Sequence, residues 1–376
     1  MARRTPIDAG AHSSEFTTPG LPLGLPPGFV LRLQRELPDD AAAILGALGP
    51  KARIGARLNP LVAAPEHTLA ELQQRHGHGI SALPGLALAI VFPTALRAAL
   101  VDDTAVRSGA LQLQNPSSQL PVLALAPQPG EEVLDLAAAP GGKTLHIAAL
   151  MGNRGRLAAV ESVKPRFFRL RENLRVGGAP QVHCYLMDGR LVAQKTPARF
   201  DRVLLDAPCS SEARFDASDP GSCAHWSAHK EGECARKQRG LLAAAFAALK
   251  PGGTLVYSTC SFSVAENEGV VDALLQAVGE AVEVLPWAPP PELAATVRPG
   301  CMVLRERPLH PAVEGAVRVL PDDLFDGFFV AVLRKHDESP QSAGMGGSRG
   351  AARRSFRDRS GKVGQQRAGG MRANRA

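Results

Sequence analysis

Two cysteines with small polar neighbours are the residues best suited to covalent chemistry. Cys209 lies in the run DAPCSS and Cys260 in the run STCSFS, and each ends an apolar stretch typical of a β-strand. A cysteine in a strand is usually a small buried apolar residue. Two cysteines at the carboxyl ends of two strands, both flanked by small polar residues, instead indicate a pair of reactive thiols, because a thiolate is a strong nucleophile.

A loop of small residues provides a candidate ligand site. The run LDLAAAPGGKT, residues 134–144, stands between an expected strand and an expected helix, where backbone N–H groups let a ligand approach closely. A phosphate loop would need glycine at Ala137, and no GxGxxG motif for a dinucleotide follows the strand. S-adenosylmethionine is the ligand that remains, so the sequence favours it as the cofactor.

Three carboxylates follow successive expected strands beside this loop. Glu161 ends the second strand, Asp188 the third and Asp206 the fourth. A carboxylate after the second strand is placed to accept hydrogen bonds from ribose hydroxyls. Each acid taken alone is read as a helix cap or a solvated turn residue, but three of them beside a glycine loop indicate a cofactor site.

The elements that must position these groups alternate along the chain from residue 132 onward. Apolar runs separated by amphipathic stretches predict an α/β fold with a doubly wound, mostly parallel sheet. The expected strands are 133–137, 157–162, 182–188, 202–209 and 254–260, with 281–285 and 328–333 as edge or antiparallel additions that bring the total to seven. The expected helices are 144–150, 165–176, 234–249 and 265–278.

The chain divides into four expected segments. Residues 1–20 read as a flexible leader, and residues 21–125 as a small α/β or α+β domain with helices near 40–48 and 68–75. Residues 126–335 form the main α/β domain, and residues 336–376 form a tail.

Positive charge is concentrated in this tail. Of the 43 Lys and Arg residues, nine lie between residues 341 and 376 beside a single acid, while the net charge of the chain is +7. The segment is rich in Gly, Ser, Ala and Gln, so we expect it to be disordered. An arginine-rich arm suits the phosphates of a nucleic acid; a solubilising tail is the alternative.

Composition excludes several classes of protein. A chain of 376 residues with 45% hydrophobic and 21% charged residues is typical of a globular protein. Its longest apolar run, 82–96, is interrupted by proline and glycine, which argues against a membrane helix, and no secretory signal follows the basic start. The six cysteines form no CxxC pair, so we expect no metal site. We therefore expect a cytoplasmic protein without membrane contact.

Several motifs together resemble a known family. In this order and spacing, LDLAAAPGGKT, LLDAPCSS, LKPGGTLVYSTCSFSVAENE and DGFFVAVLRK closely resemble the Sun-domain (Fmu-type) RNA cytosine-C5 methyltransferases. The preceding GALQLQNPSSQLPVLAL, residues 109–125, looks like the family's entry into its catalytic domain. The resemblance covers roughly residues 21–335. It implies a Rossmann-like methyltransferase sheet in 126–335, an RNA-positioning domain in 21–125, S-adenosylmethionine as cofactor and RNA as partner.

The resemblance also implies roles for individual residues. Cys260 matches the nucleophile that adds to carbon 6 of cytosine, and Cys209 the second cysteine, which helps to release the enzyme after the proton on carbon 5 is lost. Asp206 matches an aspartate beside the target base and the cofactor. Lys143 is a candidate for the positive charge that a Cys260 thiolate needs, or for a partner of the cofactor carboxylate. The residues that match the family's cofactor contacts are Ala137, Ala138, Ala139, Pro140, Gly141, Gly142, Lys143, Glu161 and Asp188.

The chain departs from the family's pattern at a few places. Ala137 stands where the family usually has cysteine, and Ser211 where it has glycine. The stretch 212–233 resembles an insertion and contains His225 and Trp226, which either stack on an RNA base or pack within the protein.

The sequence therefore predicts an S-adenosylmethionine-dependent RNA methyltransferase that forms 5-methylcytosine. Ribosomal RNA is the first choice of substrate and tRNA the alternative. A catalytically silent RNA-binding factor for ribosome assembly is the alternative from another class, but such a factor has no chemical need for the two cysteines. In a DNA methyltransferase Cys209 would be the nucleophile, and Cys260 would have no role.

Overall fold

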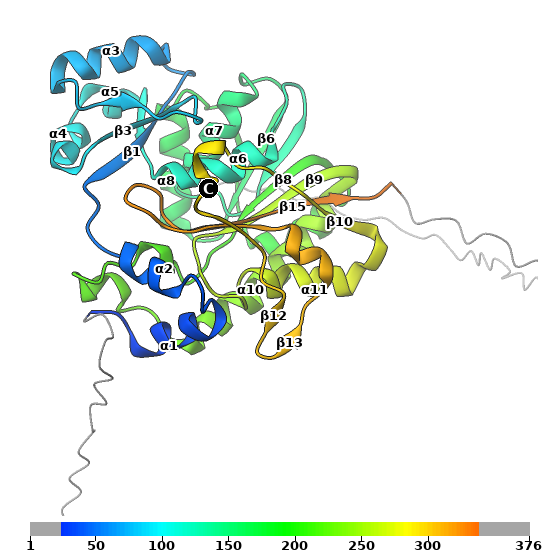
Figure 1. Ribbon diagram of the computed structural model, residues 1–376. Helices are drawn as coiled ribbons and strands as arrows, with labels where there is room; N and C mark the ends of the chain where they lie inside the picture. Colours follow the sequence, from blue (N-terminus) through cyan, green and yellow to red (C-terminus); the bar gives the residue numbers. More distant parts are fainter. Residues whose placement is uncertain (1–23, 338–376) are drawn as a thin grey trace, which may run out of the picture. The chain divides into compact units, whose positions relative to one another are not determined.

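The structure is a computed structural model that describes residues 24–337 (Figure 1). The expected leader at 1–20 and almost all of the expected tail at 336–376 lie outside the described residues. Within them, no helix combines the length and the apolar character that crossing a membrane requires.

One large sheet dominates the part of the chain from residue 132 onward. Its nine strands include five parallel ones in the order β9-β8-β5-β6-β7, which confirms the predicted doubly wound, mostly parallel sheet. The bounds of these five are β5 Glu132–Asp135, β6 Arg156–Glu161, β7 His183–Leu186, β8 Phe200–Asp206 and β9 Leu249–Thr259.

Antiparallel strands extend the sheet beyond β9. The two predicted additions appear as β10 (Val282–Leu285) and β15 (Phe328–Lys335), and β15 pairs antiparallel with both β9 and β10. Two more strands, β14 (Val317–Val319) and β11 (Val297–Pro299), complete the edge. The prediction of seven strands was wrong by these two, because a strand of three residues is too short to display an alternating pattern.

Helices cover both faces of this sheet because successive strand residues point to opposite sides. Val133 and Val256 belong to one apolar cluster, with α6, α7 and α8; Leu134 and Leu255 belong to a second, with α10 and α11. The bounds are α6 Leu120–Leu125, α7 Gly142–Leu150, α8 Lys164–Val176, α9 Val192–Lys195, α10 Ala228–Ala248 and α11 Glu268–Val278. Helix α10 begins six residues earlier than predicted, where the Ser227 hydroxyl accepts a hydrogen bond from the N–H of Lys230.

A second, smaller sheet precedes the large one. Its antiparallel strands run in the order β2-β3-β1-β4 around a separate apolar core that includes Leu72 and Phe92. Its elements are β1 Arg53–Leu58, α3 Pro65–His76, β2 Ser81–Ala82, β3 Ala89–Pro93, α4 Arg97–Val101, α5 Thr104–Ser108 and β4 Leu111–Leu113. A short hairpin, β12 (Val303–Leu304) and β13 (Arg307–Pro308), lies near the end of the described residues.

The first two helices pack on the loops that follow β8 and β9. Helices α1 (Pro27–Glu36) and α2 (Ala41–Ala47) share an apolar cluster with Phe215 and Phe262. The rings of Phe29 and Phe215 lie 5.1 Å apart, and Arg32 pairs with the buried Glu212 at 2.6 Å. These contacts hold in place the two loops that carry the cysteines.

A buried ion pair should contribute strongly to stability. The guanidinium of Arg318 on β14 donates to both carboxylate oxygens of Glu268 at 2.6 and 2.5 Å, and both side chains are buried. Replacing Arg318 with methionine leaves the Glu268 charge buried without its partner, so we expect the free energy of unfolding to fall by about 3–5 kcal/mol. Urea denaturation followed by circular dichroism measures this change.

The matched control is Arg175→Met. Arg175 pairs with Glu172 on the exposed surface of α8, where an ion pair contributes little. We expect the control to unfold at the urea concentration of the unchanged protein. Equal midpoints for the two variants would contradict a structural role for Arg318.

Candidate active site

The loop of small residues crosses the carboxyl edge of the large sheet between β5 and α7. Gly141 has a φ of 110°, which favours glycine, and a side chain there would meet Leu170. Helix α8 holds the loop from outside, since Arg166 donates to the carbonyl of Ala139 at 2.7 Å and Asn173 to that of Pro140 at 2.8 Å. The loop therefore presents backbone and small side chains to the space above the sheet.

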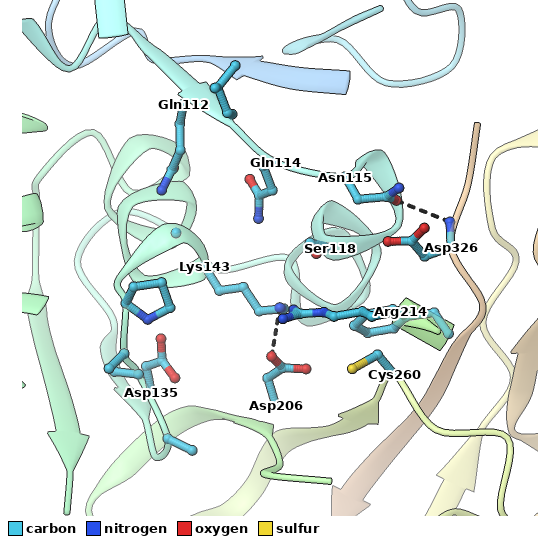
Figure 2. Close-up of a pocket in the computed structure, with 17 residues that line it drawn as sticks. Gln112, Gln114, Asn115, Ser118, Asp135, Lys143, Asp206, Arg214, Cys260 and Asp326 are labelled. Atoms are coloured by element: carbon cyan, nitrogen blue, oxygen red, sulfur yellow. Dashed lines mark hydrogen bonds and ion pairs between the residues drawn. The ribbon is translucent and has the colours of Figure 1, made fainter. Parts of the chain in front are cut away.

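Two adjoining cavities open along this loop. The first, of about 340 Å³, reaches toward the smaller sheet (Figure 2), and the second, of about 310 Å³, reaches along β6 and the chain after β7. Both are lined by Lys143, Asp206, Arg214 and Cys260. Two ligands, one in each cavity, would therefore meet at these four side chains.

Small residues and acids line the second cavity. Glu161 is buried, and its Oε1 accepts from the N–H of Val163 at 2.8 Å, while its Oε2 lies 3.7 Å from Arg166. Asp188 caps the turn that follows β7, and its hydrogen bonds with Arg190 lower the pKa of the carboxyl. The structure thus brings both predicted acids to one cavity, and Asp188 is also the cap that its position alone suggested.

Asp206 lies where the two cavities join. Its Oδ2 pairs with Lys143 Nζ at 2.7 Å (Figure 2). Its Oδ1 accepts from the Ser258 hydroxyl at 2.9 Å. A further acid, Asp135, lines the first cavity, and burial raises its pKa to about 6 although Thr144 donates to it at 2.7 Å. Sequence reasoning missed Asp135, because it lies within an expected strand rather than at its end.

The two thiols meet at the tips of β8 and β9. These strands are parallel neighbours with Asp206 opposite Ser258, so the residues that follow them leave the sheet at the same level. Cys209 Sγ and Cys260 Sγ lie 3.5 Å apart, and Cys260 lines both cavities. The separation is smaller than the width of a pyrimidine ring, so both sulfurs can contact one base.

The surroundings of the two thiols differ. The hydrogen bond with Cys209 and the nearby guanidinium of Arg214 hold the pKa of Cys260 below its usual value, against the effects of burial and of Asp206. The pKa of Cys209 is raised by its hydrogen bond with Cys260, by burial and by the charge of Glu266. Cys260 is therefore the thiol that ionises first.

Arg214 supplies the positive charge beside this thiolate. Figure 2 shows Lys143 and Arg214 converging above Asp206 and Cys260. Lys143, the cation considered from sequence, pairs with Asp206 instead. Arg214 lies in the stretch 212–233, and no local pattern marks it, because its approach to Cys260 depends on how the loop after β8 folds back.

His225 and Trp226 of the same stretch line neither cavity. The Trp226 ring packs against Phe29, with centroids 6.0 Å apart, and its Nε1–H donates to Glu212 at 2.8 Å. His225 packs beside Phe215. The structure therefore favours the packing alternative for both residues.

The smaller sheet supplies the far wall of the first cavity. Gln112 lies within β4 and Gln114 just beyond its end, and the buried Arg57 donates to their side-chain oxygens at 2.5 and 3.1 Å. Arg57 also donates to the carbonyl of Gly142 at 3.0 Å, which ties this wall to the loop. The run LQLQ, residues 111–114, could have indicated this pair from sequence, because alternate residues of a strand share one face and would place both glutamines on the same side.

Removing Arg214 should make Cys260 harder to ionise. Because this guanidinium lowers the pKa of Cys260, Arg214→Gln raises that pKa and decreases the thiolate fraction at neutral pH. We expect the pH midpoint for alkylation of Cys260 by iodoacetamide, followed by mass spectrometry, to rise by about one pH unit. Arg236→Gln is the control, because Arg236 on α10 lines neither cavity; an unchanged midpoint in Arg214→Gln would contradict the assignment.

Comparison with known proteins identifies a family to which this chain is similar. A model of the 16S rRNA methyltransferase RsmB/F family matches residues 122–334, more than half of the chain. Ribosomal RNA small subunit methyltransferase F of Aeromonas salmonicida is 36% identical over 252 residues, covering 62% of this chain and 48% of the relative. The protein of the same name from Klebsiella pneumoniae is 42% identical over 233 residues, covering 61% and 46%. The chain thus spans about half the length of these curated relatives.

A solved structure has a similar fold. The crystal structure of a methyltransferase homologue protein from Pyrococcus horikoshii matches with a TM-score of 0.68 and 29% identity, covering 83% of this chain and 100% of that one. These matches confirm the resemblance seen in the motifs. Because the family match extends across the small-residue loop, the three strand-end acids and both thiols, the chain belongs to the RsmB/F family of 16S rRNA methyltransferases.

Proposed function

We propose that this protein is an S-adenosylmethionine-dependent RNA (cytosine-C5) methyltransferase that forms 5-methylcytosine in ribosomal RNA. The observation that carries the proposal is the pair of thiols 3.5 Å apart, of which Cys260 lines both cavities and Cys209 lines the second. A pyrimidine in the first cavity and a methyl donor in the second would meet at Cys260. Membership of the RsmB/F family supports ribosomal RNA as the substrate.

The side chains of the second cavity fit S-adenosylmethionine. The buried Glu161 carboxylate retains an oxygen for the ribose hydroxyls, Asp188 faces the same space, and Lys143 suits the cofactor carboxylate. The small residues 137–142 leave room beside the backbone. When bound, the cofactor supplies a methyl group on a positively charged sulfur.

Carbon 5 of cytosine needs activation before it can accept a methyl group. The Cys260 thiolate adds to carbon 6, and the electron pair of the C5–C6 double bond moves to carbon 5. A cofactor held by Glu161, Asp188 and Lys143 would supply the methyl group to carbon 5, and S-adenosylhomocysteine, which would keep the electrons of the broken methyl–sulfur bond, would be the leaving group.

Release of the product reverses the first addition. Carbon 5 loses its proton to solvent water, the C5–C6 double bond re-forms, and the C6–Sγ bond breaks with its electrons returning to Cys260. Cys209 assists this release from its position 3.5 Å away. Asp206 lies beside Cys260, where its carboxylate reaches the ring nitrogen or the exocyclic amine of the base.

The remaining segments take supporting roles in this proposal. Residues 21–125 position the RNA, with Gln112 and Gln114 facing the base cavity, and residues 126–335 form the catalytic domain. The basic residues of 336–376 hold RNA phosphates without reading their sequence. The reaction takes place in the cytoplasm, where reducing conditions keep both thiols free.

Mapping 5-methylcytosine in total RNA from cells with and without this protein tests activity and substrate together. We expect a modified cytosine in 16S rRNA to disappear when the protein is absent. Loss of a modified cytosine in tRNA alone would identify tRNA as the substrate in place of ribosomal RNA. No lost site in any RNA, together with a ribosome-assembly defect, would favour the catalytically silent RNA-binding factor.

A further inference from the structure

One buried carboxylate connects the segments that follow both thiols. A serine comes directly after each cysteine, and the hydroxyls of Ser210 and Ser261 lie 3.0 Å apart. Glu266 Oε1 accepts hydrogen bonds from both hydroxyls, the one from Ser261 at 3.0 Å, and its Oε2 accepts from the backbone N–H of Ser210 at 3.0 Å. The same carboxylate therefore restrains the backbone beside Cys209 and beside Cys260.

Glu266 is itself held by side chains from two elements, α10 and β9. It is fully buried between β9 and α11. Gln238 on α10 donates to Glu266 Oε2 at 2.8 Å and to the carbonyl of Pro208 at 3.0 Å, and the Tyr257 hydroxyl donates to the backbone oxygen of Glu266. A displacement of this carboxylate would therefore be transmitted to Pro208 and Cys209.

The charge of Glu266 also distinguishes the two thiols. Glu266 accepts a hydrogen bond from the backbone N–H of Ser210, the residue after Cys209, and its charge contributes to the raised pKa of Cys209, whereas Arg214 lowers the pKa of Cys260. Burial raises the pKa of Glu266 to about 7. Other titratable and charged groups face Cys209, Cys260 and Glu266 from the elements packed around them. These groups are Asp206, Glu212, Arg214, Cys234, Lys237 and Tyr257.

We propose that Glu266 is a positioning residue for the cysteine pair, which bridges Ser210 and Ser261 and, opposite Arg214, keeps the proton on Cys209 and the negative charge on Cys260. Glu266 lines neither cavity, so it acts through the serines and not on the base. The inference rests on the proposed function for its effect on catalysis, but its effect on the thiols is independent of any RNA.

Alkylation of the free protein tests the charge. Glu266→Gln keeps the shape of the side chain and removes its negative charge. We expect the pH midpoint for iodoacetamide labelling of Cys209, resolved by mass spectrometry, to fall by about one pH unit. Glu231→Gln is the matched control, because Glu231 is another buried acid, and it contacts Arg32 and Ser263 but neither Ser210 nor Ser261. An unchanged Cys209 midpoint in Glu266→Gln would overturn the proposal.

A second pair of variants tests the bridge without touching the buried acid. Ser210→Ala and Ser261→Ala each remove one hydroxyl donor to Glu266, so the measurement remains possible if Glu266→Gln does not fold. With RNA and cofactor present, we expect release of the covalent enzyme–RNA adduct to slow by about tenfold or more, because small displacements of reacting groups cost large factors in rate. Adduct release at the normal rate in both serine variants would overturn the positioning role.

The two readouts separate failure of this inference from failure of the proposed function. If the unchanged protein methylates no RNA, the proposed function fails, and the Cys209 alkylation midpoints still decide whether Glu266 orders the two thiols. If the protein methylates RNA but neither the midpoints nor the release rates respond, only the role of Glu266 fails.

Discussion

Cys260→Ser should abolish both methyl transfer to RNA and formation of the covalent enzyme–RNA adduct. The hydroxyl of serine does not ionise near neutral pH, so the attack on carbon 6 loses its nucleophile even though the shape of the site is preserved. The hydrogen bond from Cys209 and the charge of Arg214, which stabilise a thiolate at this position, give little help to a neutral hydroxyl. We expect methylation to fall by about a thousandfold or more.

Transfer of a radiolabelled methyl group to RNA measures the first effect, and a retarded band on a denaturing gel measures the second. Cys184→Ser is the control, because Cys184 is a half-buried thiol of β7 that lines neither cavity. The control should methylate at the normal rate. Full methylation activity in Cys260→Ser would show that Cys260 is not the nucleophile.

Cys209→Ser should instead accumulate the covalent adduct. Cys260 keeps its thiolate and its neighbour Arg214, and the new serine hydroxyl can still donate a hydrogen bond to it, so the addition step remains. What is lost is the second sulfur, 3.5 Å from the first, which assists release once carbon 5 carries its methyl group. We expect the retarded band to increase about tenfold or more, while turnover falls to a single methylation per enzyme.

Nuclease treatment identifies this band, since the retardation should disappear when the RNA is digested. The double variant Cys209→Ser/Cys260→Ser is the control, and it should form no adduct. If the single variants behaved the opposite way, with the adduct formed only when Cys209 is present, Cys209 would be the nucleophile, as in the DNA methyltransferase alternative.

Much of the large sheet could be predicted because its strands are buried on both faces. β5, β6, β8 and β9 each contain a buried apolar run, bounded by polar or turn residues, and helices separate them along the chain. The three-residue strands β11 and β14 were missed, since their few residues become strands only through pairing at the edge of the sheet, β14 with β15 and β11 with β14.

The start of α10 differed from the prediction for a related reason. Residues 228–233, AHKEGE, contain no large apolar side chain, so no apolar period marks them as helical. In the structure Ser227 caps this turn, and Glu231 pairs with Arg32 of α1 at 3.3 Å. A partner that is distant in sequence therefore completes the first turns of the helix.

The sequence by itself determined which residues stand at strand ends, because the carboxyl ends of parallel strands meet at one edge wherever the fold is doubly wound. That rule was sufficient for the small-residue loop, Glu161, Asp188, Asp206 and the two cysteines. Only the tertiary structure decided which charges surround the thiols. Arg214 and Glu266 approach them from loops whose paths depend on α1, α10 and the segment after β9. Electrostatic effects depend on distance in space, and a linear pattern carries no information about that distance once the chain turns back on itself.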